Sequence, residues 1–318
     1  MLYTIIKKYI FGRTDWTAEE LQFQKNNPQL LEEELAKLHR RFSAMPKDVV
    51  AVDSRFTLLE RKTVRAAYEN NGHRKVKGVI DIPAAVAMAL YGGCEYVNTV
   101  AVAVFNGDAI DLAVLSVGDC VFEVLAQCWI PRGSDIAGMC SRLMDEVPDG
   151  VNIMHLIADK ETDFYDVPVL EAALFCHSVK HLNLEALCSK GCNVMSMVRN
   201  GELRDILLLE AVSSSIYVEC QKRYECVIQT NTTIPTRKAI LLDINVDETG
   251  EIPLFIRQGN SPNMKDNQLI GTMLLDGLCD TGISGHIEID VCIDIDIWYG
   301  CTVSAKNVFS GKMIQMRI

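Results

Sequence analysis

Two histidines and three cysteines stand at spacings that could bind a metal ion or supply a reactive thiol. His177 and His181 lie four residues apart beside Cys176, on what we interpret as the end of a helix. Cys188 and Cys192 repeat this spacing on one face of a predicted helix. A metal centre needs a third ligand at fixed spacing, and a thiolate needs a positive neighbourhood. The sequence supplies neither, so we expect packing roles for these residues and no metal site.

Carboxylates offer the other possible chemistry. Asp81 and Asp111 could act as an acid–base pair, although nothing in the sequence places them face to face. The alternating segment His286–Ile297 carries several more carboxylates, but side chains in line on a strand do not converge as calcium ligands must. The chain contains no nucleophile elbow, phosphate-binding loop or dinucleotide fingerprint.

Composition narrows the class of protein. The 318 residues carry a net charge of −11 and are 49% hydrophobic, as expected for a globular protein that has no nucleic-acid or membrane partner. The densest basic cluster is interpreted as a solvated helix face and loop: Arg61, Lys62, Arg65, Arg74, Lys75 and Lys77. The twelve cysteines contain no Cys-x-x-Cys pair and are predicted to be reduced. With no signal-peptide pattern or apolar span, we predict a cytoplasmic location.

The first half of the chain alternates helical and strand patterns. A capping box at Thr17 and Glu20 predicts a helix that Pro28 interrupts, and a second one at Thr57 and Glu60 predicts another. A proline-led helix of small residues follows Pro83. Further predicted elements are a helical face at Leu31, Leu35, Leu38 and Phe42, strands at 48–52 and 76–80, and helices from Ser134, after Pro168 and over 184–198.

Two turn signals predict a three-stranded meander in this half. Asn106–Gly107 between apolar runs is typical of a type I′ hairpin turn, which requires positive φ. Gly118–Asp119 predicts a second turn that leads into a strand over 121–125.

Residues Asp205–Val212 separate two regions of the chain that have different sequence patterns. Their leucine run is flanked by acidic residues, and its periodicity leaves open whether it is a buried strand or a docked linker. Downstream, nearly all segments read as strands and turns. We therefore divide the chain into residues 1–204, a hinge at 205–212, and residues 213–318. The strands expected beyond the hinge are 217–218, 226–228, 239–246, 252–256, 273–275 and 286–297.

At this point the sequence resembles the 70-kDa heat-shock chaperone (Hsp70) family over most of its length. The leucine run of the hinge is similar to the family's interdomain linker, at Leu207, Leu208 and Leu209. A series of C-terminal motifs is similar, in order, to its peptide-binding domain: Asn231–Thr236, Gly259, Lys265–Asn267, Leu269–Gly271, Asp294–Asp296 and Val303–Ala305. Upstream matches are Lys7–Arg13, Ile80–Pro83 and Gly118–Val124.

The resemblance implies an α/β plus β architecture. Residues 1–204 would form an incomplete actin-like ATPase domain, and residues 213–318 a β-sandwich that ends where the family's helical lid would begin. The family binds ATP and magnesium, with a catalytic lysine that matches Lys7 or Lys8 and nucleotide contacts that match Gly107, Asp111 and Gly191.

The departures from the family pattern concentrate on the nucleotide cleft. The second phosphate hairpin keeps one glycine of three, with Val104 where an aspartate would stand and Asp108 adding negative charge. The proline-led helix has lost a glutamate and a threonine, the first phosphate hairpin would precede Met1, and no adenosine-gripping subdomain fits between Val147 and Val151. We therefore expect no bound cofactor.

The family's peptide-binding positions are matched better in this sequence than its nucleotide-binding positions. The residues that match the family's peptide site are Ile252, Tyr224 and Val218, and long chains at Gln221–Arg223 replace two glycines. Extended apolar polypeptides are the implied partners. The family's J-domain partners use an arginine at the position of Gly78, so the resemblance does not carry over J-domain binding.

Three functions remain open at this level. The favoured one is a chaperone-like peptide binder that has lost ATP coupling. The alternatives are an ATP-dependent folding chaperone and a degenerate relative without function.

Overall fold

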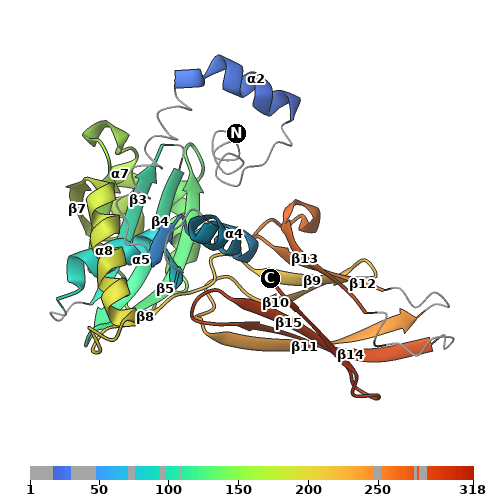
Figure 1. The fold of residues 1–318 in the computed structure, drawn as a ribbon. Coiled ribbons are helices and arrows are strands. Elements are labelled where there is room, and N and C mark those ends of the chain that lie inside the picture. Colours follow the sequence, from blue (N-terminus) through green and yellow to red (C-terminus); the bar gives the residue numbers. More distant parts are fainter. Residues whose placement is uncertain are drawn as a thin grey trace.

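The computed structural model describes residues 17–29, 48–70, 76–93, 98–107, 109–246, 252–275, 278 and 285–318. Figure 1 shows a mixed α/β molecule in which a large sheet with its helices lies beside a second group of strands from the C-terminal part. The mixed α/β class expected from the sequence is confirmed.

The first described elements begin at the two predicted capping boxes. In α2 (Ala18–Asn26), Thr17 and Glu20 cap each other's backbone amides. In α4 (Leu58–Asn70), the Thr57 amide donates to Glu60 Oε2 at 2.8 Å. The proposed helical face from Leu31 to Phe42 lies outside the described residues.

Two short buried strands precede the proline-led helix. The strands β1 (Val49–Val52) and β2 (Gly78–Asp81) pair in parallel. Helix α5 (Ile82–Tyr91) then begins with Pro83 in its first turn, where the missing amide costs nothing, and ends at Gly92.

The large sheet has six strands in the order β7-β6-β3-β4-β5-β8. Its strands are β3 (Thr99–Asn106), β4 (Ala109–Gly118), β5 (Val121–Pro131), β6 (Ile153–Ala158), β7 (His177–Leu182) and β8 (Leu207–Leu209). The first three form the predicted antiparallel meander, and β6, β7 and β8 join in parallel. The helices between them are α6 (Ile136–Met144), the short η1 (Glu161–Asp163), α7 (Val167–Leu174) and α8 (Leu184–Arg199).

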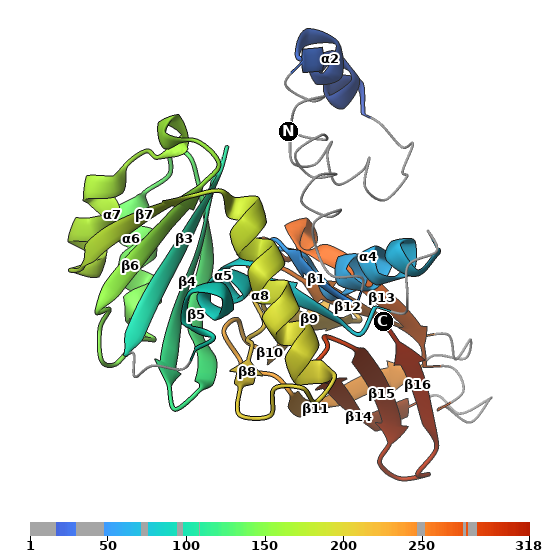
Figure 2. The ribbon, with the colours of Figure 1, turned by 60° about the vertical axis from the view of Figure 1, so that its left-hand side comes forward.

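Both faces of this sheet are buried, which explains the unbroken apolar run of β3. Val100, Val102 and Val104 pack into a core with α5 and α8, whereas Ala101, Ala103 and Phe105 pack into a core with α6 and α7. Figure 2 shows α5 and α8 on one side of the sheet and α6 and α7 on the other.

The two turns of the meander differ in detail from the turns that the sequence predicted. Asn106 pairs with Ala109 and is itself a strand residue, and Gly107 follows it in the turn with φ +59°. In the second turn, Asp119 and Cys120 both have positive φ and connect Gly118 to Val121.

Three other sequence interpretations need correction. His177 and His181 lie on strand β7 because this segment pairs with β6, which the sequence analysis did not identify. Helix α6 begins two residues after Ser134, where Asp135 provides the cap. Cys120 is disulfide-bonded, in contrast to the reduced state expected for all cysteines, whereas nine other described cysteines are free.

The C-terminal part forms two four-stranded antiparallel sheets. One has the order β10-β9-β12-β13 and the other β11-β14-β15-β16. Their bounds are β9 (Ile216–Cys220), β10 (Arg223–Ile228), β11 (Thr236–Val246), β12 (Pro253–Gln258), β13 (Gln268–Leu274), β14 (Gly285–Ile295), β15 (Cys301–Asn307) and β16 (Met313–Arg317), with η2 (Met264–Asp266) between β12 and β13. Alternate residues of both sheets, such as Val218, Ile256 and Val291, share one apolar core.

Helix α4 joins the two parts of the molecule. It lies between the six-stranded sheet and the C-terminal strands in Figure 1, and Leu58 is a buried member of the C-terminal core. Among the described residues, no helix combines the length and apolar character that a membrane crossing requires.

Candidate functional site

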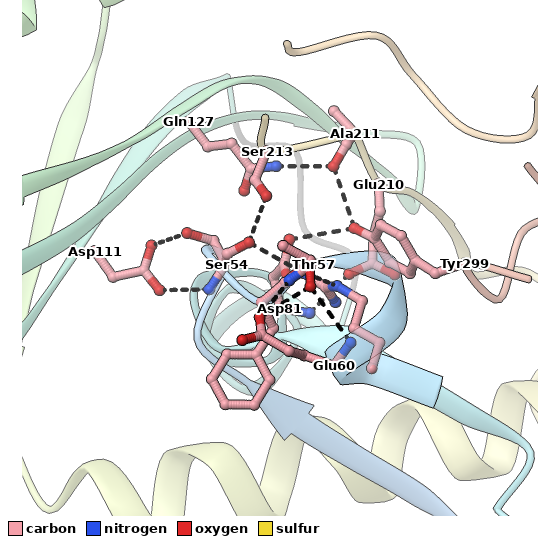
Figure 3. Close-up of polar contacts among 12 residues, drawn as sticks. Ser54, Thr57, Glu60, Asp81, Asp111, Gln127, Glu210, Ala211, Ser213 and Tyr299 are labelled. Carbon is pink, nitrogen blue, oxygen red and sulfur yellow. Dashed lines mark hydrogen bonds and ion pairs between the residues drawn. The ribbon is translucent and has the colours of Figure 1, made fainter. Parts of the chain in front are cut away.

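A buried polar network occupies the junction between the two parts (Figure 3). Arg61 of α4 contacts several of its members. The Arg61 guanidinium forms an ion pair with Asp81, and the two side chains are 3% and 1% exposed. Arg61 Nε donates to the Phe56 carbonyl at 3.0 Å and Nη2 to the Ser54 carbonyl at 3.2 Å. Asp81 is the cap residue of α5, so this pair fixes α4 against β2 and α5.

The C-terminal part reaches the same pair through Tyr299. Its ring lies against the Arg61 guanidinium, 4.0 Å from the ring centroid. The Tyr299 hydroxyl is 3.2 Å from both Asp81 Oδ2 and the Ala211 carbonyl oxygen, so its one proton can go to either acceptor. Because Tyr299 is only 4% exposed, the contact connects β2, the hinge and the C-terminal strands without solvent.

The hinge contributes a second buried carboxyl group. The Asp81 amide donates to Glu210 Oε1 at 2.8 Å, and the Ile234 amide donates to the Glu210 carbonyl at 2.8 Å. Burial and the nearby Asp81 carboxylate raise the pKa of Glu210 to about 8, although Arg61 acts in the opposite direction. Arg61 therefore faces two carboxyl groups, and Arg199 also acts on Glu210, which nevertheless holds its proton at neutral pH.

Residues after Glu210 are fixed from both sides. The Gln127 side chain of β5 donates from Nε2 to the Ala211 carbonyl at 2.8 Å, and the Gln127 backbone amide donates to Asn231 Oδ1 at 3.0 Å. The Ser213 hydroxyl donates to the Ser54 carbonyl. The end of the predicted hinge is therefore held in the junction by hydrogen bonds to several elements.

Arg61 was not expected here, because the sequence analysis assigned it to a solvated basic face. The structure corrects that interpretation for Arg61, whereas Lys62 remains exposed. A signal was present in the spacing: Leu58 and Arg61 are three residues apart on one helix face, and Leu58 is buried.

The leucine run of the hinge forms strand β8 at the edge of the six-stranded sheet. Leu207, Leu208 and Leu209 pair in parallel with Val121, Phe122 and Glu123 of β5. Leu207 is 50% exposed, while Leu208 packs against the core and Leu209 is partly buried. Of the two possibilities left open, the run is a docked edge strand and not a fully buried one.

The residues proposed for nucleotide binding have internal partners. Asp111 is fully buried, and Ser54 donates to it from its amide (2.9 Å) and from its hydroxyl (2.5 Å). Burial and the neighbouring Asp53 raise the pKa of Asp111 to about 7, against the effect of the Ser54 hydrogen bonds. Asp81 and Asp111 lie on opposite sides of Ser54 in Figure 3 and have no direct hydrogen bond.

The two glycines of that proposed site lie in different surroundings. Gly191 of α8 packs so tightly on α5 that an added Cβ would lie 1.8 Å from the Ala85 carbonyl oxygen. Gly107 lies at the open hairpin tip with nothing within 4 Å of such a Cβ. Lys7 and Lys8 lie outside the described residues.

The residues proposed for peptide binding divide between core and surface. Val218 and Ile252 are 1% and 3% exposed and belong to the core shared by the two C-terminal sheets. Tyr224 is opposite Glu219 in the β9–β10 hairpin, and its hydroxyl donates to Glu219 Oε1 at 3.0 Å. The hairpin turn contains Gln221 and Lys222, both at positive φ, and the Gln221 side chain is hydrogen-bonded to the Asn245 backbone.

A cavity of about 70 Å³ lies beside this turn. Its walls come from β9, β10 and β11 and include Arg223 and the 59%-exposed Leu241. The structure therefore places Tyr224 and the charged turn near one another, whereas Val218 and Ile252 do not line this cavity.

A histidine cluster was missed by the sequence analysis. His155 Nδ1 of β6 is 2.9 Å from His181 Nε2 of β7, and the Tyr91 hydroxyl is hydrogen-bonded to His155 Nε2. Burial and the neighbouring His181 lower the pKa of His155 to about 4. Only the pairing of β6 with β7 brings these residues together, so the sequence carried no local signal. Among the described residues, no group of three or more His, Cys, Asp or Glu side chains is arranged to hold a metal ion.

Comparison with protein families identifies the C-terminal part. Residues 172–318 match the family model described as Hsp70 protein. Over this stretch the chain is similar to the Hsp70 family. The match begins within α7 and includes β7, α8, β8 and both four-stranded sheets, so the family resemblance seen in the sequence is confirmed there. The match in this stretch supports a chaperone-like function with polypeptide substrates.

Proposed function

We propose that this protein is an Hsp70-like chaperone module that binds extended apolar polypeptide through its C-terminal strands, without control by ATP. The observation that carries the proposal is the Hsp70 match, which covers both four-stranded sheets and the preceding hinge. In this proposal, residues 213–318 form the β-sandwich substrate-binding domain, residues 205–212 the linker, and residues 1–204 an incomplete actin-like domain.

The surface beside the β9–β10 turn supports the peptide-binding part of this proposal. An exposed leucine, Leu241, lies in the cavity wall next to Arg223, and the adjacent Lys222 is also exposed. In this proposal an apolar side chain packs beside Leu241. Glu225 and Asp243 also line the cavity, so the preference for acidic flanking residues depends on Lys222 and Arg223 at the turn. Since Val218, Ile252 and the turn are packed or hydrogen-bonded, this surface is small and we expect weak binding.

The surroundings of Asp111 and Gly191, two of the described positions that match the family's nucleotide contacts, support a function that does not depend on ATP. A carboxylate that holds metal-bound water must be accessible, but both oxygens of Asp111 accept hydrogen bonds from Ser54 in a fully buried site. The backbone of Gly191 is occupied by its contact with Ala85. These internal contacts support the proposal that Asp111 and Gly191 do not hold a nucleotide.

The test is fluorescence anisotropy of labelled leucine-rich peptides against the full chain. We expect weak binding that is stronger for a peptide with acidic flanks than for one with basic flanks, and unchanged by Mg-ATP. Leu241→Asp should weaken binding at least fivefold, whereas Leu269→Asp, at a 43%-exposed position on β13, should not. Tight binding that Mg-ATP reduces would overturn the ATP-independent proposal in favour of an ATP-driven chaperone.

A further inference from the structure

A second cavity, of about 290 Å³, lies at the junction outside the buried network. Helix α4 forms one wall through Arg61, Lys62 and Arg65, and Val79 of β2 lies beside them. The opposite wall comes from the C-terminal part and consists of Trp298, Tyr299, Gly300, Arg317 and Ile318. Its volume is at the lower end of the range for pockets that bind small molecules, roughly 300–1,000 Å³.

The charged side chains that line this cavity all have the same sign. Four of the described lining residues are basic, and none has an acidic side chain. Asp81 neutralises Arg61, but Lys62, Arg65 and Arg317 form no ion pair with any described residue. Three basic side chains therefore surround a concave surface without an ion-pair partner in the described part of the chain, which favours a positive potential there.

Unsatisfied donors at the cavity provide an independent indication of a ligand. Arg61 is 97% buried, and its Nη1 has no hydrogen-bond partner in the described part of the chain. The same is true of Arg65 Nε. Buried donors in folded proteins nearly always have a hydrogen-bond partner, so these two donors indicate a site for an acceptor from a ligand.

The C-terminal wall is held in a fixed shape. Asp296 Oδ1 accepts hydrogen bonds from the amides of Trp298 (2.7 Å) and Gly300 (2.8 Å). The Arg199 guanidinium lies over the Trp298 ring at 3.3 Å from its centroid, and Arg61 lies over Tyr299. Since a cation already occupies a face of each ring, the wall is suited to a compact anion and less so to a stacked aromatic base.

We propose that this cavity binds a small multivalent phosphate anion. Guanidinium groups match phosphate oxygens in geometry, and the lysine adds a point charge. The anion would contact Lys62 and Arg65 on α4 and Arg317 at the end of β16, and would therefore hold the two parts of the molecule together. This site is separate from the peptide surface beside Leu241 and from the positions matched to the family's nucleotide cleft.

The experiment uses pyrophosphate as the probe and the full chain, at constant ionic strength set with sodium chloride. We expect a saturable rise in Tm of a few degrees at about 100 times Kd. Isothermal titration should show one site per chain. The double variant Lys62→Gln/Arg317→Gln should bind at least tenfold more weakly, and Arg65→Gln should also weaken binding.

The matched control is Lys190→Gln/Arg204→Gln, which removes the same charge from exposed positions outside the cavity. It should bind pyrophosphate as the unmodified chain does. Lys62 and Arg317 are exposed, so the Tm of their variant without ligand should remain within about 2 °C, and this verifies folding. No saturable shift, or equal weakening in the control, would overturn the proposal.

Discussion

At the scale of single residues, the junction depends on two carboxyl groups that share one arginine. Arg61 is paired with Asp81, and the Asp81 amide is hydrogen-bonded to Glu210. A second full negative charge beside Asp81 would be costly in this buried position, so the protein keeps Glu210 protonated. The charge state of the junction is therefore sensitive to pH.

Glu210→Gln should remove this pH dependence. In the folded protein Glu210 holds its proton up to about pH 8, whereas the unfolded chain releases it near its ordinary pKa of 4.5. The contribution of the protonated group to stability is thus fully present below pH 4.5 and is lost as the pH rises to 8. The free energy of unfolding of the variant, relative to the unmodified protein, should increase by up to about 1.4 kcal/mol per pH unit within this window.

Urea unfolding at pH 5, 6, 7 and 8 measures this difference. Other titrating groups, including Asp111 and His155, are common to both proteins and cancel. Glu202→Gln at an exposed position is the control and should give a constant difference. Parallel stability curves for Glu210→Gln and the unmodified protein would show that Glu210 is already ionised in the folded state.

At the scale of elements, two contacts hold the hinge and the helical layer on the six-stranded sheet. Strand β8 pairs with β5 through only three residues, so much of its attachment must come from the apolar side chains that it buries. Helix α8 approaches α5 closely because Gly191 has no side chain. The contact of β8 with β5 and the contact of α8 with α5 can therefore each be tested by a substitution at a single position.

Leu208→Asp should release the hinge, whereas Leu207→Asp should not. Leu208 packs against the core, and Leu207 is half exposed on the same strand. A buried unpaired carboxylate is unfavourable by several kcal/mol, while a solvated one costs little. Limited proteolysis should cut residues 205–212 at least tenfold faster in the Leu208 variant. Equal cutting of the two variants would contradict the docked arrangement of β8.

Gly191→Ala should destabilise the helical layer. The new methyl group would meet the Ala85 backbone, which cannot move without displacing α5, and overpacking of this kind costs about 1–3 kcal/mol or more. The control is Gly93→Ala, because a Cβ at Gly93 has open space. Thermal melts should show a Tm several degrees lower for the first variant and almost no change for the second. An unchanged Tm for Gly191→Ala would mean that α8 and α5 are less closely packed.

At the scale of the whole molecule, the N-terminal and C-terminal parts share elements. Helix α4 supplies Leu58 to the C-terminal core and Arg61 to the contact with β2, and the Leu58 amide donates to Gln258 Oε1 at 2.9 Å. The Tyr299 hydroxyl closes the same junction from the C-terminal side. Unfolding of either part therefore disrupts contacts of the other.

Tyr299→Phe should lower the stability of both parts together. The change removes one buried hydroxyl and leaves its acceptors without that donor, at a cost of about 1–2 kcal/mol. Urea unfolding can be followed separately through Trp129 and Trp298 in single-tryptophan proteins, and both midpoints should fall equally. Tyr224→Phe, which loses a partly exposed contact to Glu219, should change the free energy of unfolding at neither probe by more than about 0.5 kcal/mol. A shift at Trp298 alone would indicate that the junction, where Trp298 packs against the N-terminal core, opens without unfolding of the six-stranded sheet.

The sequence by itself determined what depends on local spacing. The capping boxes at Thr17 and Thr57, the Pro83 helix, the β3–β4–β5 meander and many of the C-terminal strands were predictable, because caps, turns and alternation act over a few residues. The Hsp70 resemblance of the C-terminal part was also present in its ordered motifs.

Only the tertiary structure decided what depends on distant partners. Strands β6 and β7, and with them the His155–His181 contact, exist through parallel pairing between segments more than twenty residues apart. Arg61 looked like a surface charge because its partners, Asp81 and Tyr299, lie 20 and 238 residues away in the chain. Burial of such a group, and the shared junction and cavity that it creates, result from the packing of α4 between the two parts of the fold.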